Sequence, residues 1–174
     1  NIRRGETFVL LGESGSGKSI TALSIMRLLP VAIKINAGEV ILNDKNLFQL
    51  PENKMREVRG ANIGMIFQEP QTSLNPVLTA GQQISETLHQ HTNLSNNQCI
   101  THSIELLDAV GIPEPERRIN EYPHQFSGGM KQRIMIAIAL AGEPDLLIGD
   151  EPTTALDVTI QAQVLELLRK LQHE

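Results

Sequence analysis

The spacing of apolar and polar residues predicts alternating strands and helices at both ends of the chain. An apolar run at 7–11 ends at a glycine, which predicts a buried strand followed by a turn. Apolar residues at helical spacing follow at 18–29, and Pro30 ends that segment. The same patterns predict strands at 39–42, 62–67 and 146–149, a turn at 43–44, and helices at 52–58, 129–141 and 158–171.

The middle of the chain has a different sequence pattern, with helical segments and no predicted strand. A loop rich in proline and asparagine begins at residue 70, and helical patterns follow at 80–91 and 96–110. The segment 111–125 carries three prolines, which predicts a connector with at most a short helix. Alternating strands and helices imply a parallel sheet covered by helices. We therefore expect one α/β domain, with core segments 1–71 and 127–174 around a helical subdomain at about 72–126.

Composition narrows the range of functions. The net charge of −5 and the 3% aromatic content do not match a nucleic-acid-binding surface. A single cysteine excludes an internal disulfide and fits a reducing compartment. The longest apolar run, 134–141, is too short to span a bilayer. The chain opens at Asn1, close to a strand, and we interpret it as a piece of a longer protein.

The segment 12–19 matches the phosphate-loop pattern G-x-x-x-x-G-K-[ST] at every position. Glycines let successive N–H groups turn toward phosphate oxygens, and the following helix adds its positive end. Lys18 is expected at the β- and γ-phosphates, and the Ser19 hydroxyl at Mg²⁺. The residues expected to bind the phosphates are Gly12, Ser14, Gly15, Ser16, Gly17, Lys18, Ser19 and Ile20.

The predicted strand 146–149 runs into two carboxylates, Asp150 and Glu151. In parallel sheets, ligands bind beyond the carboxyl ends of the strands. Asp150 is therefore a candidate metal ligand, and Glu151 a candidate base for the water that attacks the γ-phosphate. Alone, the pair is a weak signal, and acidic residues at a helix start explain it better. The phosphate loop in the same chain favours the catalytic interpretation.

A third motif opens the helix predicted at 129–141. Ser127 is a good N-cap, and Gly128 and Gly129 expose the first N–H groups of the helix. Taken alone, the motif describes a capped helix and nothing more.

Together the motifs resemble the ATP-binding cassette (ABC) family. Residues 127–130 are similar to its signature sequence, Gln68 to its Q-loop glutamine, and 155–157 to its D-loop, all in the family's order. The stretches 67–76, 122–130 and 151–159 are similar to ATPases of dipeptide and oligopeptide importers. Phe126 and Met130 depart from the family consensus but suit that branch, whereas Ile20 replaces a common threonine and loses its hydroxyl.

The resemblance implies a P-loop NTPase (RecA-like) core with an antiparallel β part and a helical subdomain. It implies ATP and Mg²⁺ as ligands, with Ser19, Gln68 and Asp150 near the metal. Glu151, Gln68 and Lys18 would be catalytic. Two cassettes would face each other head to tail, so that Ser127, Gly128 and Gly129 serve the partner's ATP and Asp157 lies at the seam.

The implied partners are a second ABC ATPase subunit, identical or homologous, two integral-membrane permease subunits and, indirectly, a solute-binding protein. The implied location is peripheral, on the cytoplasmic face of the membrane, without a nucleic-acid partner. The family's adenine-stacking aromatic and switch histidine are expected outside this chain, so the fragment alone should bind and hydrolyse ATP poorly. His173 and the histidines of the insert are not assigned the switch role.

Two other functions stay open. One is a soluble ABC ATPase acting on DNA or ribosomes, which the acidic charge and the importer-like stretches disfavour. The other is an ATP-binding switch without hydrolysis, which Glu151 disfavours. The cargo is open among dipeptides, oligopeptides, glutathione, nickel and similar solutes.

Overall fold

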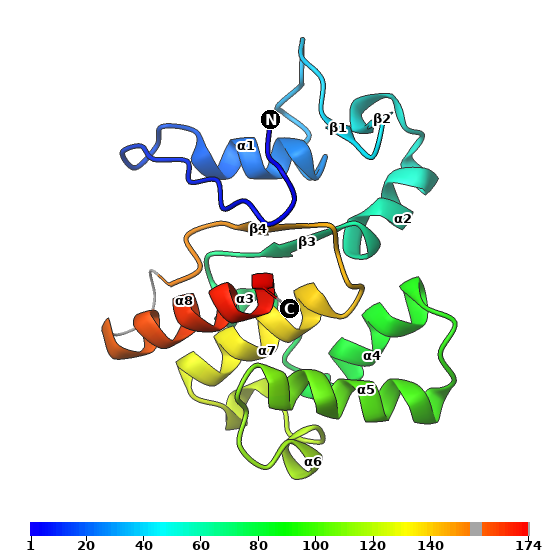
Figure 1. The fold of residues 1–174 in the computed structure, drawn as a ribbon, viewed down its shortest axis with the longest axis vertical. Coiled ribbons are helices and arrows are strands. Elements are labelled where there is room, and N and C mark those ends of the chain that lie inside the picture. The colour runs from blue at the N-terminus through cyan, green and yellow to red at the C-terminus, as the bar shows by residue number, and fades with distance from the viewer. Residues whose placement is uncertain (154–157, 174) are drawn as a thin grey trace. The chain divides into compact units, whose positions relative to one another are not determined.

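A computed structural model describes residues 1–153 and 158–173 of the chain. The chain divides into two compact units, Asn1–Arg59 and Gly60–Glu174. Figure 1 shows the order of the elements along the chain. The extent of the helical subdomain, about 72–126, stays a prediction.

The first unit contains one phosphate-loop helix and a small hairpin. The strands pair antiparallel, and Asn43 and Asp44 between them have φ angles of 49° and 61°. Two consecutive residues with positive φ are typical of the tight type I′ turn, which asparagine and aspartate tolerate. The turn predicted at 43–44 is confirmed. The elements are α1 (Lys18–Ile25), β1 (Ile41–Leu42), β2 (Lys45–Asn46), η1 (Leu47–Gln49) and α2 (Glu52–Ala61).

Two arginines tie the end of α1 to the rest of this unit. Arg59 donates to the backbone oxygens of Met26 and Arg27, at 2.7 and 3.2 Å, and also to Glu52. Arg27 donates to the backbone oxygens of Leu47 and Leu50. The hydrogen bond from Arg59 is the largest cause that lowers the pKa of Glu52, and the charges of the neighbouring arginines add to it. These contacts satisfy carbonyl groups that a helix end leaves open.

Two predictions for this unit are wrong in detail. The segment 7–11 forms no strand in the described part of the chain, and its side chains are exposed, Leu11 at 88%. No described strand pairs with it, and an extended segment becomes a strand only through a neighbouring ladder. Helix α1 ends at Ile25 because Arg27 adopts a φ of 52°, a left-handed conformation that cannot continue a helix.

The second unit contains the predicted parallel sheet. Strand β3 (Ile63–Ile66) pairs with β4 (Leu146–Gly149), in a register that runs from Ile63 opposite Leu146 to Ile66 opposite Gly149. All of β3 is buried, whereas β4 is half-buried and exposed at its end, less covered than the sequence predicts. In the described residues β3 is the only strand paired with β4, so much of its surface is open.

Helices form most of the second unit, and several begin with predictable caps. Thr79 and Gln82 form a capping box at α4, and the Ser127 hydroxyl accepts from the Met130 N–H at α7. The prolines of the connector still allow one turn of helix, α6, and the short α3 was not predicted. The helices are α3 (Pro70–Ser73), α4 (Ala80–His91), α5 (Asn96–Ala109), α6 (Pro115–Arg118), η2 (Pro123–Gln125), α7 (Gly128–Leu140) and α8 (Val158–His173).

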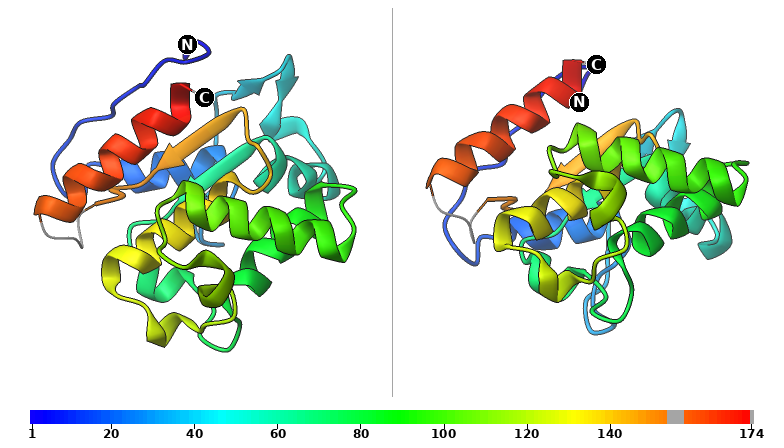
Figure 2. Two further views of the ribbon diagram at one scale, coloured as in Figure 1. Left: turned by 60° about the horizontal axis from the view of Figure 1, so that its bottom comes forward. Right: turned by 90° about the horizontal axis from the view of Figure 1, so that it is seen from below.

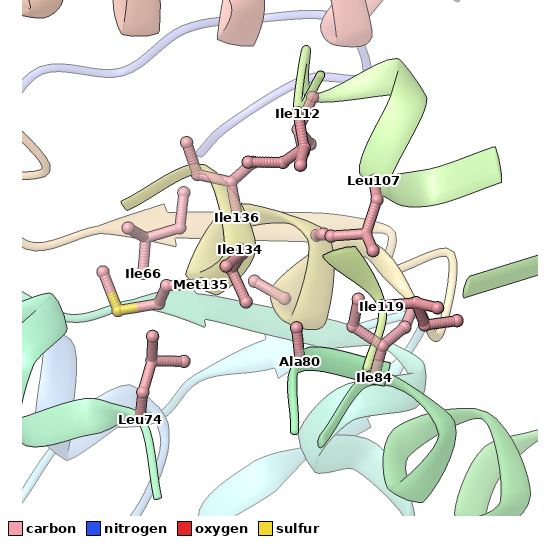
Figure 3. Packing of buried hydrophobic residues seen from close by; sticks show 14 of the residues in the cluster. Ile66, Leu74, Ala80, Ile84, Leu107, Ile112, Ile119, Ile134, Met135 and Ile136 are labelled. Atoms are coloured by element: carbon pink, nitrogen blue, oxygen red, sulfur yellow. The ribbon is translucent and has the colours of Figure 1, made fainter. Parts of the chain in front are cut away.

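Helix α7 is the centre of this unit. It packs against β3, α3, α4 and α5, and its Ile134 and Ile136 are at most 1% exposed. Figure 3 shows these side chains among Ile84 of α4 and Leu107 of α5. Figure 2 shows α4 and α5 lying together beside α7. Among the described helices, none combines the length and apolar character needed to cross a bilayer.

Candidate nucleotide-binding site

The backbone of the phosphate loop has the curled form that anion binding needs. Gly15 and Gly17 have φ angles of 80° and 94°, which only glycine adopts at little cost. A Cβ atom at Gly12 would collide with the Ser16 hydroxyl, so a larger residue there would have to displace that side chain. Residues 12–16 are exposed. The loop therefore offers an accessible, turned backbone to a ligand.

Lys18 closes the loop on itself. Its Nζ atom donates to the backbone oxygens of Gly12 and Glu13, at 2.9 and 3.1 Å. Gly17 caps α1 in a left-handed conformation, so the helix starts directly from the loop. The ammonium group and the positive end of α1 thus lie at one short segment, the arrangement that favours a bound phosphate.

Gln68 and Glu151 meet at the carboxyl ends of the two parallel strands. Gln68 follows β3 by two residues, and Glu151 follows β4 by two residues. Because Ile66 and Gly149 are paired in register, this equal offset places the two side chains at the same level of the sheet. The Gln68 Nε2 atom donates to the Glu151 Oε2 atom at 3.0 Å. The predicted strand bounds, 62–67 and 146–149, put Gln68 one residue and Glu151 two residues after a strand, so the equal offset and the contact appear only with the observed strand ends.

The backbone around the two acids differs from a regular strand. The Asp150 N–H donates to the Ile66 carbonyl at 2.9 Å, which extends the ladder by one residue. Glu151 has a φ of 47°, an uncommon left-handed conformation for a non-glycine residue. Such a residue turns the chain sharply. The regular strand therefore ends at this point.

The third motif presents an open helix start. Ser127 and Gly128 are exposed, and a Cβ atom at Gly128 would meet no atom within 4 Å. The Ser127 hydroxyl accepts from the Met130 N–H at 3.3 Å. This end of α7 has room for a group to approach its backbone. Asp157, the remaining predicted site residue, lies outside the described residues.

The predicted metal ligands have a chemistry that suits Mg²⁺. Ser19, Gln68 and Asp150 supply a hydroxyl, an amide and a carboxylate oxygen, all hard donors. Magnesium commonly takes one or two protein oxygens and completes its shell with phosphates and water. In the part of the chain that is described, no three histidine, cysteine or acidic side chains gather to hold a metal. The donor set fits a metal carried in by a phosphate ligand.

A curled Gly-Lys-Ser loop before a helix, with polar residues at the ends of parallel strands, defines a P-loop nucleotide-binding protein. The chain belongs to the ABC transporter family, whose sequence profile matches residues 1–154.

Two curated relatives come from Bacillus subtilis. The chain is 54% identical over 173 residues to the oligopeptide transport ATP-binding protein OppD, covering 99% of this chain and 48% of that protein. It is 53% identical over 175 residues to the dipeptide transport ATP-binding protein DppD, covering all of this chain and 52% of that protein. The chain thus spans about half the length of these relatives.

A solved structure has the same fold. It is a dimeric ATP-binding cassette in a post-hydrolysis state, bound to ADP and Pi. Its TM-score is 0.85 and its identity 34%, over 99% of this chain and 72% of that one. The predicted α/β cassette fold is confirmed.

Proposed function

We propose that this chain is the ATP-binding and hydrolysing part of an importer for peptides or similar small solutes. The observation that carries the proposal is the Gln68–Glu151 pair at the ends of β3 and β4, in a chain with a complete phosphate loop. A carboxylate and an amide side by side match what is needed to hold and deprotonate a water molecule.

The residues divide the reaction between them. Lys18 and the loop backbone would hold the β- and γ-phosphates of ATP. Ser19 and Asp150 would hold Mg²⁺, which neutralises charge on the phosphates. Glu151 would accept a proton from the attacking water, and the amide of Gln68 would orient Glu151 through their hydrogen bond.

The open start of α7 has no use within this scheme unless a second subunit is present. Ser127, Gly128 and Gly129 would bind the γ-phosphate held by the partner subunit, as the head-to-tail cassette arrangement implies. ATP would then join two positive helix ends, and hydrolysis would weaken the dimer. The dimeric relative bound to ADP and Pi supports this part of the proposal.

The partners follow from the same relationship. The relatives are oligopeptide and dipeptide transport ATP-binding proteins, which favours an importer over an ATPase acting on DNA or ribosomes. We place the protein against two integral-membrane permease subunits at the cytoplasmic face, with a solute-binding protein as an indirect partner. Nearly equal identity to OppD and DppD leaves the length of the peptide open.

Purification of the tagged full-length protein from its native membrane tests the proposal. We expect two multispanning proteins to copurify, and the complex in vesicles to hydrolyse ATP faster when cargo and its binding protein are supplied. A Glu151→Gln complex is the control for contaminating ATPases. Recovery with nucleic acid or ribosomes instead of membrane proteins would establish the alternative.

A further inference from the structure

Arg133 joins three helices of the second unit. It lies on α7, six residues after the cap Ser127, and is half-buried. Its Nη1 atom donates to the Val110 carbonyl at 2.6 Å, and its Nη2 atom to the Gln163 Oε1 atom of α8 at 2.9 Å. One planar guanidinium thus ties α7 to the end of α5 and to α8.

The C-terminal end of α5 has a backbone geometry that leaves the Val110 carbonyl available to the Arg133 guanidinium. Gly111 has a φ of 76° and donates its N–H to Asp108, while the Ile112 N–H donates to Leu107. This pair of hydrogen bonds is the Schellman motif, and the buried Ile112 and Leu107 complete it. The motif satisfies the carbonyls of Leu107 and Asp108, and the guanidinium binds that of Val110 at the negative end of the helix.

Gly111 also makes room for the arginine. A Cβ atom there would lie 2.8 Å from Nη1, closer than such contacts allow. The left-handed backbone favours glycine here, and any side chain at this position would also have to displace the guanidinium. The Arg133 guanidinium therefore lies close to the backbone at the end of α5.

We infer that Arg133 is a positioning residue that aims the start of α7. Long side chains on a helix point back toward its N-terminus, so the guanidinium lies over the turn nearer to Ser127. By fixing α7 to α5 and α8, it holds the open end with Ser127 and Gly128 in one direction. This inference rests on the proposed function, in which that end binds the ATP of a partner subunit.

The experiment uses full-length protein in which Glu151→Gln slows turnover, so that an ATP-dependent dimer persists. Three readouts are compared: Mg-ATP affinity at low protein concentration, the protein concentration at half dimerisation, and the melting temperature. Arg133→Lys keeps the charge but cannot reach both acceptors. We expect ATP affinity within about twofold, but half dimerisation at about tenfold more protein, since hydrogen bonds to a charged group are lost.

Two further variants test whether Arg133 acts through its helix contacts. Gln163→Leu removes only the α8 arm, and Gly111→Asn keeps a residue that tolerates positive φ but displaces Nη1. Each should weaken dimerisation, and Gln163→Leu should add nothing to Arg133→Lys. Two variants are the matched controls: Arg169→Lys, at an exposed arginine on α8, and Gly5→Asn, at a φ of 70° where an added Cβ atom would meet no atom within 4 Å.

The outcomes separate the possible failures. If Arg133→Lys weakens dimerisation while Gln163→Leu and Gly111→Asn do not, the arginine acts directly and the inference is wrong. It is also wrong if ATP affinity and melting temperature fall together with dimerisation in every variant, since that marks general destabilisation. Failure of the Glu151→Gln parent to bind ATP or dimerise would instead overturn the proposed function.

Discussion

The phosphate loop and the strand ends place their chemical groups by different means. In the loop, local backbone geometry does the placing: Gly15 and Gly17 curl the chain, and Lys18 bonds carbonyls five and six residues away. At the strand ends, Gln68 and Glu151 are 83 residues apart in sequence and meet only because β3 and β4 pair. The first arrangement depends on residues close in sequence, whereas the second depends on the pairing of distant segments.

Burial follows the same division. The buried apolar side chains of the first unit are few, namely Ala22, Met26, Leu47 and Met55. The second unit has one large cluster around α7 that includes Ile66, the last residue of β3. Mutations in the loop should therefore alter ligand affinity with little effect on folding, and mutations near the strand ends can alter both.

The largest effect expected concerns the strand ends. In the full-length protein, Glu151→Gln should retain Mg-ATP binding and slow hydrolysis by about 10²–10⁴, because the amide cannot accept the proton of the attacking water. Steady-state ATPase assays with parallel nucleotide titrations measure both. Glu143→Gln is the matched control, since Glu143 also has a positive φ, 51°, but lies before β4. Wild-type turnover in Glu151→Gln would reassign that residue to a structural role.

The dependence of the second unit on packing can be tested at a glycine. A Cβ atom at Gly142 would overlap the backbone carbonyl of Gly60, which cannot rotate away as a side chain can. Gly142→Ala should therefore cost about 3 kcal/mol of unfolding free energy, measured by urea denaturation. Gly128→Ala is the control: an added Cβ atom there would meet no atom within 4 Å, so this variant should be as stable as the wild type or more stable. Equal stability of both variants would show that 60 and 142 can separate without cost.

The sequence predicted the structure well where it depends on neighbouring residues. It predicted less where the structure depends on contacts between segments far apart in the chain. The phosphate loop, the turn at 43–44 and the capped helices α4 and α7 follow from residues near one another in the chain. The segment 7–11 has the apolar pattern of a strand but no described partner strand, so the pattern alone did not fix its state. The Arg133 contacts were not predicted, because Val110 and Gln163 are reached only through the packing of three helices.

A variant at Lys18 tests whether the phosphate loop affects ligand binding without affecting folding. Lys18→Ala should lower Mg-ATP affinity by about 1.5–3 kcal/mol, since it removes a charge-assisted contact to the phosphates, and leave the melting temperature nearly unchanged. Equilibrium binding of a fluorescent ATP analogue and thermal unfolding provide the two measurements. Lys34→Ala, at an exposed position of the same unit, is the control. If Lys18→Ala lowered the melting temperature as much as Gly142→Ala does, the phosphate loop would contribute to folding as the packed second unit does.

The smallest effect expected concerns the acid stability of the first unit. Arg59 lowers the pKa of Glu52 by a hydrogen bond, with further help from its own charge and those of Arg27 and Arg56. A carboxylate whose pKa is lower in the folded state stabilises the fold above its unfolded pKa. That contribution is lost as the pH falls through the folded pKa.

Acid titration should therefore destabilise the wild type more than Glu52→Gln, whose amide has no proton to take up. Stability is measured by urea denaturation at steps from neutral pH to about pH 3, around the usual carboxylate range. Glu57→Gln, another exposed carboxylate on α2, is the matched control for the loss of a surface charge. Because Glu52 is exposed, added salt should also reduce the difference between wild type and Glu52→Gln. The same pH dependence in both proteins would mean that Arg59 does not form its hydrogen bond with Glu52 in solution.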